Sequence, residues 1–140
     1  MEKRYIIALD QGTTSSKAIV YDTVSKHVVG MKNKTLNQKY PHPGWVEHNA
    51  DEIWHDQLEV LRQVVHKLHI HTEEIACIGI TNQRETVVVW DKNTGKPIHN
   101  AIVWQCRRTA PLCNDLIQKG FGDIIHEKTG LVIDAYFSAT

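Results

Sequence analysis

Short apolar runs separated by polar turns occupy the first quarter of the chain. Residues 6–9 and 18–21 are rich in branched side chains, which is typical of buried strands. A third strand is predicted at residues 27–34, where Val28 and Val29 are apolar, after the polar turn at 22–26. Three consecutive strands joined by short turns predict an antiparallel meander. This pattern favours an α/β or α+β fold over an all-helical one.

A helix is predicted after residue 49, because apolar residues recur there at intervals of four, three, four and three. Asn49 is a suitable N-cap, and Glu52 stands where a capping box places its acidic partner. The recurring residues form one apolar stripe, which should cover a face of the sheet. The stripe consists of Trp54, Leu58, Leu61, Val65 and Leu68.

Residues 75–81 are almost continuously apolar, which predicts a central strand buried on both faces. The remaining segments are punctuated by glycines, and Gly120, Gly122 and Gly130 are interpreted as helix stops. In chain order we predict a strand at 86–90, a turn at 91–96, a strand at 101–104 and helices at 109–119 and 123–128.

The segment 37–49 is predicted to be a loop, since two prolines and a glycine within four residues exclude regular structure. Its tryptophan and glutamate are compatible with a functional loop. The interpretation that we favour is a turn held against the core by Trp45.

Composition narrows the class of protein. The chain has 140 residues, 41% hydrophobic and 23% charged, as expected for one globular domain. Sixteen basic and sixteen acidic residues balance, so charge gives no reason to expect nucleic acid or an anionic membrane as partner. No apolar run approaches the roughly 18 residues of a membrane span.

Cysteine and histidine usage adds two expectations. The cysteines are odd in number and lack CxxC spacing, which indicates reduced thiols and a cytoplasmic location. We interpret Cys106 and Cys113, which are seven residues apart and could share a helix face, as small buried residues. A metal site is possible at His66, His69 and His71, but a solvated helix end is the favoured interpretation.

The turn between the first two strands holds the first candidate chemistry. Gly12 can adopt a positive φ and lets the backbone approach a ligand closely. The hydroxyls of the next four residues, Thr13 to Ser16, and the neighbouring N–H groups suit phosphate oxygens. Asp10 is placed to hold a hydrated Mg²⁺ beside them. From these residues alone, an ordinary glycine-containing hairpin loop remains an equal alternative.

A second candidate site follows the strand at 75–81. Arg84 and Glu85 offer fixed donors and fixed acceptors side by side, which matches the hydroxyls of a polyol. The flat indole of Trp104 suits the C–H side of a small carbon chain, and Tyr136 adds a hydroxyl. The alternatives are a surface ion pair and two core aromatic residues.

Four motifs carry a resemblance that runs from Tyr5 to the last residue. The first resembles the phosphate motif of the sugar kinase, actin and heat-shock ATPase superfamily, and in its detail that of the FGGY carbohydrate kinases. The other three resemble FGGY kinases that act on glycerol. In order, the motifs are Asp-Gln-Gly-Thr-Thr-Ser-Ser-Lys, Ile-Gly-Ile-Thr-Asn-Gln-Arg-Glu-Thr, Asn-Ala-Ile-Val-Trp-Gln-Cys-Arg-Arg-Thr and Thr-Gly-Leu-Val-Ile-Asp-x-Tyr-Phe-Ser.

The resemblance implies a fold, cofactors and roles. The fold is α/β, part of an actin-like/ribonuclease H-like ATPase domain, with a mixed sheet, an amino-terminal antiparallel meander and flanking helices. The implied cofactors are ATP and Mg²⁺, with Asp10 at the metal. Implied nucleotide contacts are Gly12, Thr13, Thr14, Ser15 and Lys17. Implied glycerol contacts are Arg84, Glu85, Trp104 and Tyr136.

The resemblance also implies that residues 1–140 are the amino-terminal part of the first kinase domain. The catalytic base, a second phosphate motif and the adenosine pocket would lie downstream, so no catalytic residue is expected here and the fragment alone should be inactive. A homo-oligomer is expected of the whole protein. Departures from the family pattern are Lys17, Asn49 and Ala135.

Two alternatives remain open. One is an FGGY kinase for another polyol or ketose, which the triplet from Gln83 to Glu85 disfavours. The other is a non-catalytic actin-like ATPase domain, which has no need for the polar cluster around Arg84 and Glu85.

Overall fold

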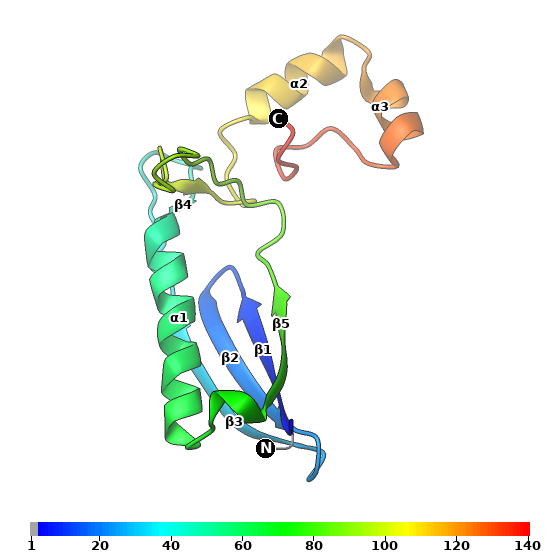
Figure 1. Ribbon diagram of the computed structural model, residues 1–140. Coiled ribbons are helices and arrows are strands. Elements are labelled where there is room, and N and C mark those ends of the chain that lie inside the picture. Colours follow the sequence, from blue (N-terminus) through cyan, green and yellow to red (C-terminus); the bar gives the residue numbers. More distant parts are fainter. Residues whose placement is uncertain (1–2) are drawn as a thin grey trace. The chain divides into compact units, whose positions relative to one another are not determined.

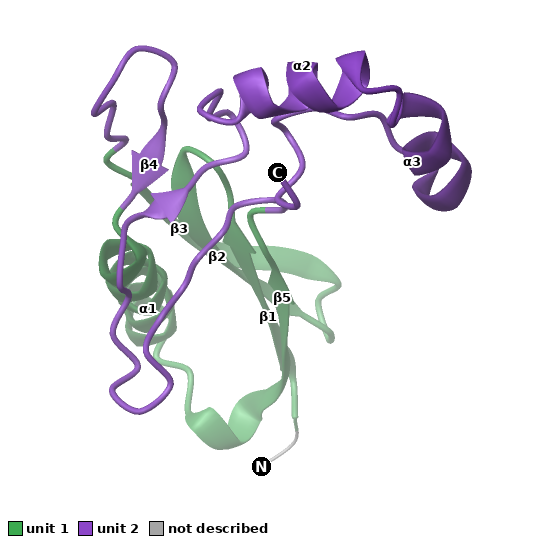
Figure 2. Ribbon diagram, turned by 90° about the horizontal axis from the view of Figure 1, so that it is seen from above, with its two compact units in different colours: residues 1–37, 49–83 green, residues 38–48, 84–140 purple. Residues whose placement is uncertain are grey.

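The computed structural model describes residues 3–140, and the chain divides into two units within it (Figure 2). The first unit consists of the chain up to residue 37 together with residues 49–83. The second consists of residues 38–48 and 84–140. Each unit has its own hydrophobic cluster.

The first unit is built on a four-stranded sheet with the order β3-β2-β1-β5. β1 (Tyr5–Gln11), β2 (Ser15–Asp22) and β3 (His27–Thr35) pair antiparallel, which confirms the predicted meander. β5 (Ile75–Thr81) pairs with β1 in parallel, so the sheet is mixed, as predicted (Figure 1).

The prediction that β5 is a central strand buried on both faces is wrong for the part of the chain that the structure describes. There β5 has one neighbour, β1, and forms an edge of the sheet. Ile80 is 77% exposed, and Ile78 is exposed as well. A continuous apolar run is typical of a strand that is buried on both faces, but it does not identify the segments that bury it.

One helix, α1 (Ala50–Lys67), packs against β2 and β3 (Figure 1). The N-cap prediction is confirmed, since the Asn49 side chain accepts hydrogen bonds from the N–H groups of Asp51 and Glu52. The capping box is wrong, because the Glu52 carboxylate accepts from Asn37 instead. A short 3₁₀ helix (Thr72–Glu74) links the end of this helix region to β5.

The predicted apolar stripe is displaced around α1. The fully buried apolar positions are Val60 and Val64, whereas Trp54 is 63% exposed. Val60 and Val64 belong to the core of the first unit, together with Ile7, Ala18, Val20 and Ile70. Three residues of the predicted stripe pack at the margin of this core, namely Leu61, Val65 and Leu68. Spacing identified the helix correctly but misjudged the centre of its buried face by a fraction of a turn.

The second unit has few regular strands. β4 (Glu47–His48) and β6 (Ala101–Ile102) pair antiparallel. The expectation of no regular structure at 37–49 is therefore wrong at its end. The predicted strand at 86–90 forms only isolated bridges, Val87 with Ile102 and Trp90 with Pro97. The predicted strand at 101–104 is two residues long.

Two helices complete the second unit, α2 (Ala110–Gln118) and α3 (Gly122–Thr129). Gly120 and Gly130 have positive φ at or beyond the helix ends, as predicted. Gly122 begins α3 rather than stopping α2. Cys106 and Cys113 are buried free thiols, but Cys106 precedes α2, so the two do not share a helix face.

The predicted turns of this unit are present. Trp45 packs against the small core of Val46, Val103 and Cys106, in agreement with the favoured interpretation of the 37–49 segment. The turn at 91–96 is confirmed, because Asp91 donates its N–H to the Lys96 carbonyl and its carboxylate accepts from the N–H of Asn93 and Thr94.

Candidate functional site

The first candidate site is the three-residue turn between β1 and β2. The Gly12 N–H donates to the Ser15 carbonyl at 3.0 Å. A Cβ at position 12 would lie 3.2 Å from that oxygen. Gly12 does not use the positive φ that glycine allows, since it is absent from the positive-φ positions of residues 3–140. Glycine is favoured here by the close approach of the two backbone segments.

Asp10 and Lys17 lie directly opposite each other in the β1–β2 register. Lys17 Nζ is 3.1 Å from Asp10 Oδ2, and each side chain is about a third exposed. The Lys17 carbonyl accepts a hydrogen bond from Gln57 of α1. The pair places one carboxylate and one ammonium together at the mouth of the turn.

The hydroxyls of the turn differ in accessibility. Thr14 is exposed, and Thr13 and Ser15 are half-buried. Ser16 is fully buried and donates to Gln11 Oε1 at 2.8 Å, so its predicted role as a phosphate donor is wrong. Alternation along β2 explains this, because residue 16 points to the face that α1 covers.

The turn offers a donor and acceptor set that fits a magnesium–phosphate ligand. Mg²⁺ keeps most of its waters and takes one or two carboxylates together with phosphate oxygens. Asp10 provides such a carboxylate beside accessible hydroxyls and the Lys17 ammonium. Within residues 3–140, no group of three or more His, Cys, Asp or Glu side chains could hold a metal by itself.

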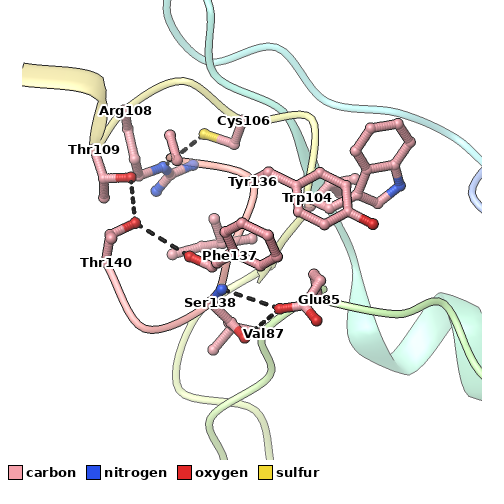
Figure 3. A pocket seen from close by; sticks show the side chains of 13 residues that line it. Glu85, Val87, Trp104, Cys106, Arg108, Thr109, Tyr136, Phe137, Ser138 and Thr140 are labelled. Atoms are coloured by element: carbon pink, nitrogen blue, oxygen red, sulfur yellow. Dashed lines mark hydrogen bonds between the residues drawn. The ribbon is translucent and has the colours of Figure 1, made fainter. Parts of the chain in front are cut away.

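The second candidate site is a pocket of about 150 Å³ in the second unit (Figure 3). Three of the four predicted polyol residues line it, namely Glu85, Trp104 and Tyr136. One water needs only about 10–15 Å³ measured in the same way, so the pocket has room for more than a single water. The pocket therefore has room for a molecule with a few heavy atoms, and it offers that molecule a carboxylate, an indole and a phenol.

An aromatic wall forms one side of this pocket. The rings of Trp104 and Tyr136 meet at an interplanar angle of 63° with centroids 5.4 Å apart. Phe137 packs edge-on against Tyr136 at 5.0 Å. The Tyr136 backbone N–H donates to Asp134, whose carboxylate is paired with Arg107. The Arg107 guanidinium donates a hydrogen bond to this carboxylate, which holds the pKa of Asp134 below its ordinary value.

Glu85 is held in place by Ser138 (Figure 3). Its Oε2 accepts hydrogen bonds from the Ser138 N–H at 3.2 Å and from the Ser138 hydroxyl at 3.0 Å (Figure 3). Its φ of 60° lies in the left-handed region, which a non-glycine residue adopts at a cost. Both bonds use one carboxylate oxygen, which leaves the other oxygen available to a ligand.

The fourth predicted polyol residue is placed differently. Arg84 is exposed and does not line the pocket. The ion pairs formed within residues 3–140 do not include it. The structure thus brings Glu85, Trp104 and Tyr136 together. Arg84 adjoins Glu85 in the sequence, but within residues 3–140 its guanidinium forms none of the ion pairs.

Sequence reasoning missed several lining residues, of which Ser138 and Arg108 carry the most chemistry. Ser138 stands two residues after Tyr136 in a motif that was singled out. Arg108 follows Arg107 in another such motif. The side chain of Arg108 is mostly buried, in contrast to that of Arg107. Nothing in the two adjacent letters distinguishes these arginines.

Comparison with known proteins identifies a family. A model described as the FGGY family of carbohydrate kinases, N-terminal domain, matches residues 5–140. A glycerol kinase of Caldanaerobacter subterraneus subsp. tengcongensis is 64% identical over 137 residues, 98% of this chain and 27% of the relative. A glycerol kinase of Brevibacillus brevis is 61% identical over 140 residues, 100% of this chain and 28% of the relative.

Solved structures agree with this assignment. The crystal structure of Plasmodium falciparum glycerol kinase with ADP matches with a TM-score of 0.87 and 37% identity, over 99% of this chain and 28% of that one. The likeness to gluconate kinase from Lactobacillus acidophilus, TM-score 0.79 at 22% identity over 94% of this chain and 26% of that one, concerns the fold alone. These matches confirm the predicted partial actin-like/ribonuclease H-like fold.

The chain is much shorter than these relatives. It spans 27–28% of the length of the glycerol kinases named above. Within residues 3–140, no helix combines the length and the apolarity that crossing a membrane requires.

Proposed function

The chain belongs to the FGGY family of carbohydrate kinases, and we propose that it is the amino-terminal part of an ATP-dependent kinase that phosphorylates glycerol. The observation that carries this proposal is the pocket of the second unit. It joins a carboxylate, an indole and a phenol around a volume suited to a molecule of glycerol's size. In the proposed reaction, a terminal hydroxyl of glycerol attacks the γ-phosphorus of ATP, giving ADP and glycerol 3-phosphate.

The pocket residues would bind and orient glycerol. The free oxygen of Glu85 accepts from glycerol hydroxyls, while Ser138 keeps the carboxylate in one orientation. The indole of Trp104 packs on the carbon chain, and the Tyr136 hydroxyl offers a donor and an acceptor. Arg84 would contribute from outside the pocket wall, where its guanidinium is exposed. Holding the substrate in one geometry is a large part of the catalytic effect.

The hairpin of the first unit would hold the nucleotide phosphates. Asp10 takes the hydrated Mg²⁺, and Gly12, Thr13, Thr14 and Ser15 provide N–H and hydroxyl donors. Bound Mg²⁺ supplies neutralisation of the charge on the transferred phosphoryl group. Lys17, now paired with Asp10, supplies a cation beside the same oxygens.

The proposal extends to the whole protein. The base that takes the proton of the attacking hydroxyl, a second phosphate motif and the adenosine pocket would belong to the remainder of a polypeptide about as long as its relatives. We propose a cytoplasmic location and a homo-oligomer for that protein. The chain 1–140 alone would then be inactive.

The test is phosphoryl transfer by an intact protein that carries this chain. ADP release is measured in a coupled assay with ATP, Mg²⁺ and glycerol, and separately with xylulose and gluconate. Glycerol is expected to give the highest kcat/KM. A higher value with either sugar substrate, or ADP release that does not depend on any polyol, would overturn the proposal.

A further inference from the structure

A buried ion pair lies outside the four predicted polyol residues. Glu47 of β4 and Arg108, which precedes α2, meet at 2.7 Å between Oε1 and a terminal guanidinium nitrogen. Their side chains are 5% and 13% exposed. Removing two charges from water has a desolvation cost that can exceed their mutual attraction. Net stability therefore does not explain why this pair is present.

Glu47 is held as a carboxylate from two sides. Its second oxygen, Oε2, accepts a hydrogen bond from Asn100 at 2.8 Å. Burial alone would raise the pKa of Glu47, but the hydrogen bonds from Asn100 and Arg108 outweigh burial and keep that pKa below its ordinary value. The charge that faces Arg108 is therefore present at neutral pH.

Arg108 is held from two further sides. Its guanidinium carbon lies 3.9 Å above the centroid of the Trp45 ring, a cation–π contact. Its Nε donates to Cys106 Sγ at 3.0 Å (Figure 3). Arg108 also lines the pocket that contains Glu85 and Trp104. Only a planar guanidinium can satisfy a carboxylate, a sulfur and an aromatic face at the same time.

The backbone joins this pair to both sides of the pocket. Glu47 is paired with Ile102 in the β4–β6 ladder. Ile102 exchanges two hydrogen bonds with Val87, each of 2.9 Å. Ile102 and Val87 line the pocket themselves, and each is two residues from a predicted contact, Trp104 and Glu85 respectively.

We infer that Glu47 and Arg108 are positioning residues for the proposed polyol pocket: Glu47 acts through Arg108, and Arg108 sets the wall that it shares with Trp104. Arg108 anchors the segment that carries Trp104, while Glu47 anchors Arg108 and the ladder leading to Glu85. This gives a role to the Trp-Val-Glu-His segment, which otherwise has only a packing role. The inference rests on the proposed function, because its readout is the use of glycerol.

The chain supplies a matched control in the adjacent arginine. Arg107 forms a two-pronged ion pair with Asp134 at 2.8 and 3.2 Å. That pair is open to solvent, with side chains 51% and 36% exposed. A lysine at position 107 also loses one prong, but an exposed pair contributes little, so the effect there should be small. The same substitution at position 108 loses the fork and the stacking surface.

The experiment compares Arg108→Lys with Arg107→Lys in the intact kinase. KM for glycerol, KM for ATP and kcat are measured for both variants, and folding is checked by circular dichroism. We expect Arg108→Lys to raise KM for glycerol about tenfold or more, as for loss of a charged hydrogen bond, with little change in KM for ATP. We expect Arg107→Lys to raise KM for glycerol by less than about fivefold, because its pair is exposed and Asp134 still accepts the Tyr136 N–H.

A third variant separates positioning from folding. Glu47→Gln/Arg108→Gln removes both buried charges and leaves two amides able to bond each other. If this variant folds and its KM for glycerol stays raised, the pair positions the pocket. A KM that returns to the wild-type value overturns the inference. So do equal effects of the two lysine variants, or a loss shared equally by glycerol and ATP.

A failure of the proposed function gives a different result from a failure of this inference. In that case the wild-type protein itself does not phosphorylate glycerol, whatever happens at position 108. If Arg108→Lys does not fold, the amide pair alone decides between the two outcomes.

Discussion

The two candidate sites are built by different means. The β1–β2 hairpin of the first unit, which we propose to hold phosphate, is held by backbone ladders, in which each residue from Tyr5 to Gln11 has a partner on β2. The proposed polyol pocket of the second unit lies among turns and two-residue strands, and side chains hold it together. Single side-chain changes should therefore disturb the pocket more than the hairpin.

The largest expected effect is on the buried ion pair of the pocket. Glu47→Ala leaves the Arg108 guanidinium buried without its carboxylate, which should lower the free energy of unfolding by about 3–5 kcal/mol. Urea unfolding followed by circular dichroism measures the change. For comparison, Asp10→Ala in the hairpin removes an exposed pair worth about 0–1 kcal/mol. Equal losses for the two variants would contradict the comparison.

The next effect concerns kinetics, and it compares one substitution in each candidate site. Glu85→Gln should raise KM for glycerol about ten- to a hundredfold, because a charged acceptor is lost, while KM for ATP is unchanged. Asp10→Asn should instead lower kcat and increase the Mg²⁺ concentration needed, with KM for glycerol unchanged. Steady-state kinetics of the intact kinase at several Mg²⁺ concentrations check both. A rise in KM for glycerol in Asp10→Asn would show that the sites are not separate.

A smaller effect is expected when the support of Glu85 is weakened. Ser138→Ala removes the hydroxyl that donates to Glu85 at 3.0 Å but keeps the backbone donor. Loss of one such hydrogen bond should raise KM for glycerol about three- to tenfold. Ser138→Thr keeps a hydroxyl and is the control. If both variants resemble the wild type in KM, Ser138 has no positioning role.

The smallest effect is expected from acid in the first unit. Asp22 is buried and paired with Arg4, and the hydrogen bond from Arg4 holds the pKa of Asp22 well below its ordinary value. The stabilisation is therefore complete above the unfolded-state pKa of about 3.9 and is lost as pH falls toward the folded-state pKa. Unfolding curves from pH 6 to pH 2 should show stability falling below about pH 4. Asp22→Asn should flatten that fall; an unchanged slope would exclude Asp22 as its cause.

Sequence patterns predicted the first unit well and the second unit less well. Alternation and turn spacing located β1, β2 and β3, and Asn49 capped α1 as expected. These features are local, so a window of residues contains them. The strand at 86–90 was overpredicted, because its residues favour a β conformation but pair with partners only at isolated bridges.

The site was partly predictable for the same reason. Glu85, Trp104 and Tyr136 were found through motifs and do line one pocket. Arg108 was missed because its partner, Glu47, lies 61 residues away along the chain. No local pattern distinguishes Arg108 from Arg107; only the folded structure shows which guanidinium is buried.

The mixed sheet has a consequence for the order of folding. Ile7 pairs with Val20 across a short turn and with Ile78 across most of the first unit. Closing the longer loop costs more chain entropy, so the β1–β2–β3 meander should form early and β5 should dock only after α1 is in place. Pulsed hydrogen exchange during refolding should protect the amides of β2 before those of β5. The parallel ladder, although it contains the most apolar strand of the sheet, would then be the slow step.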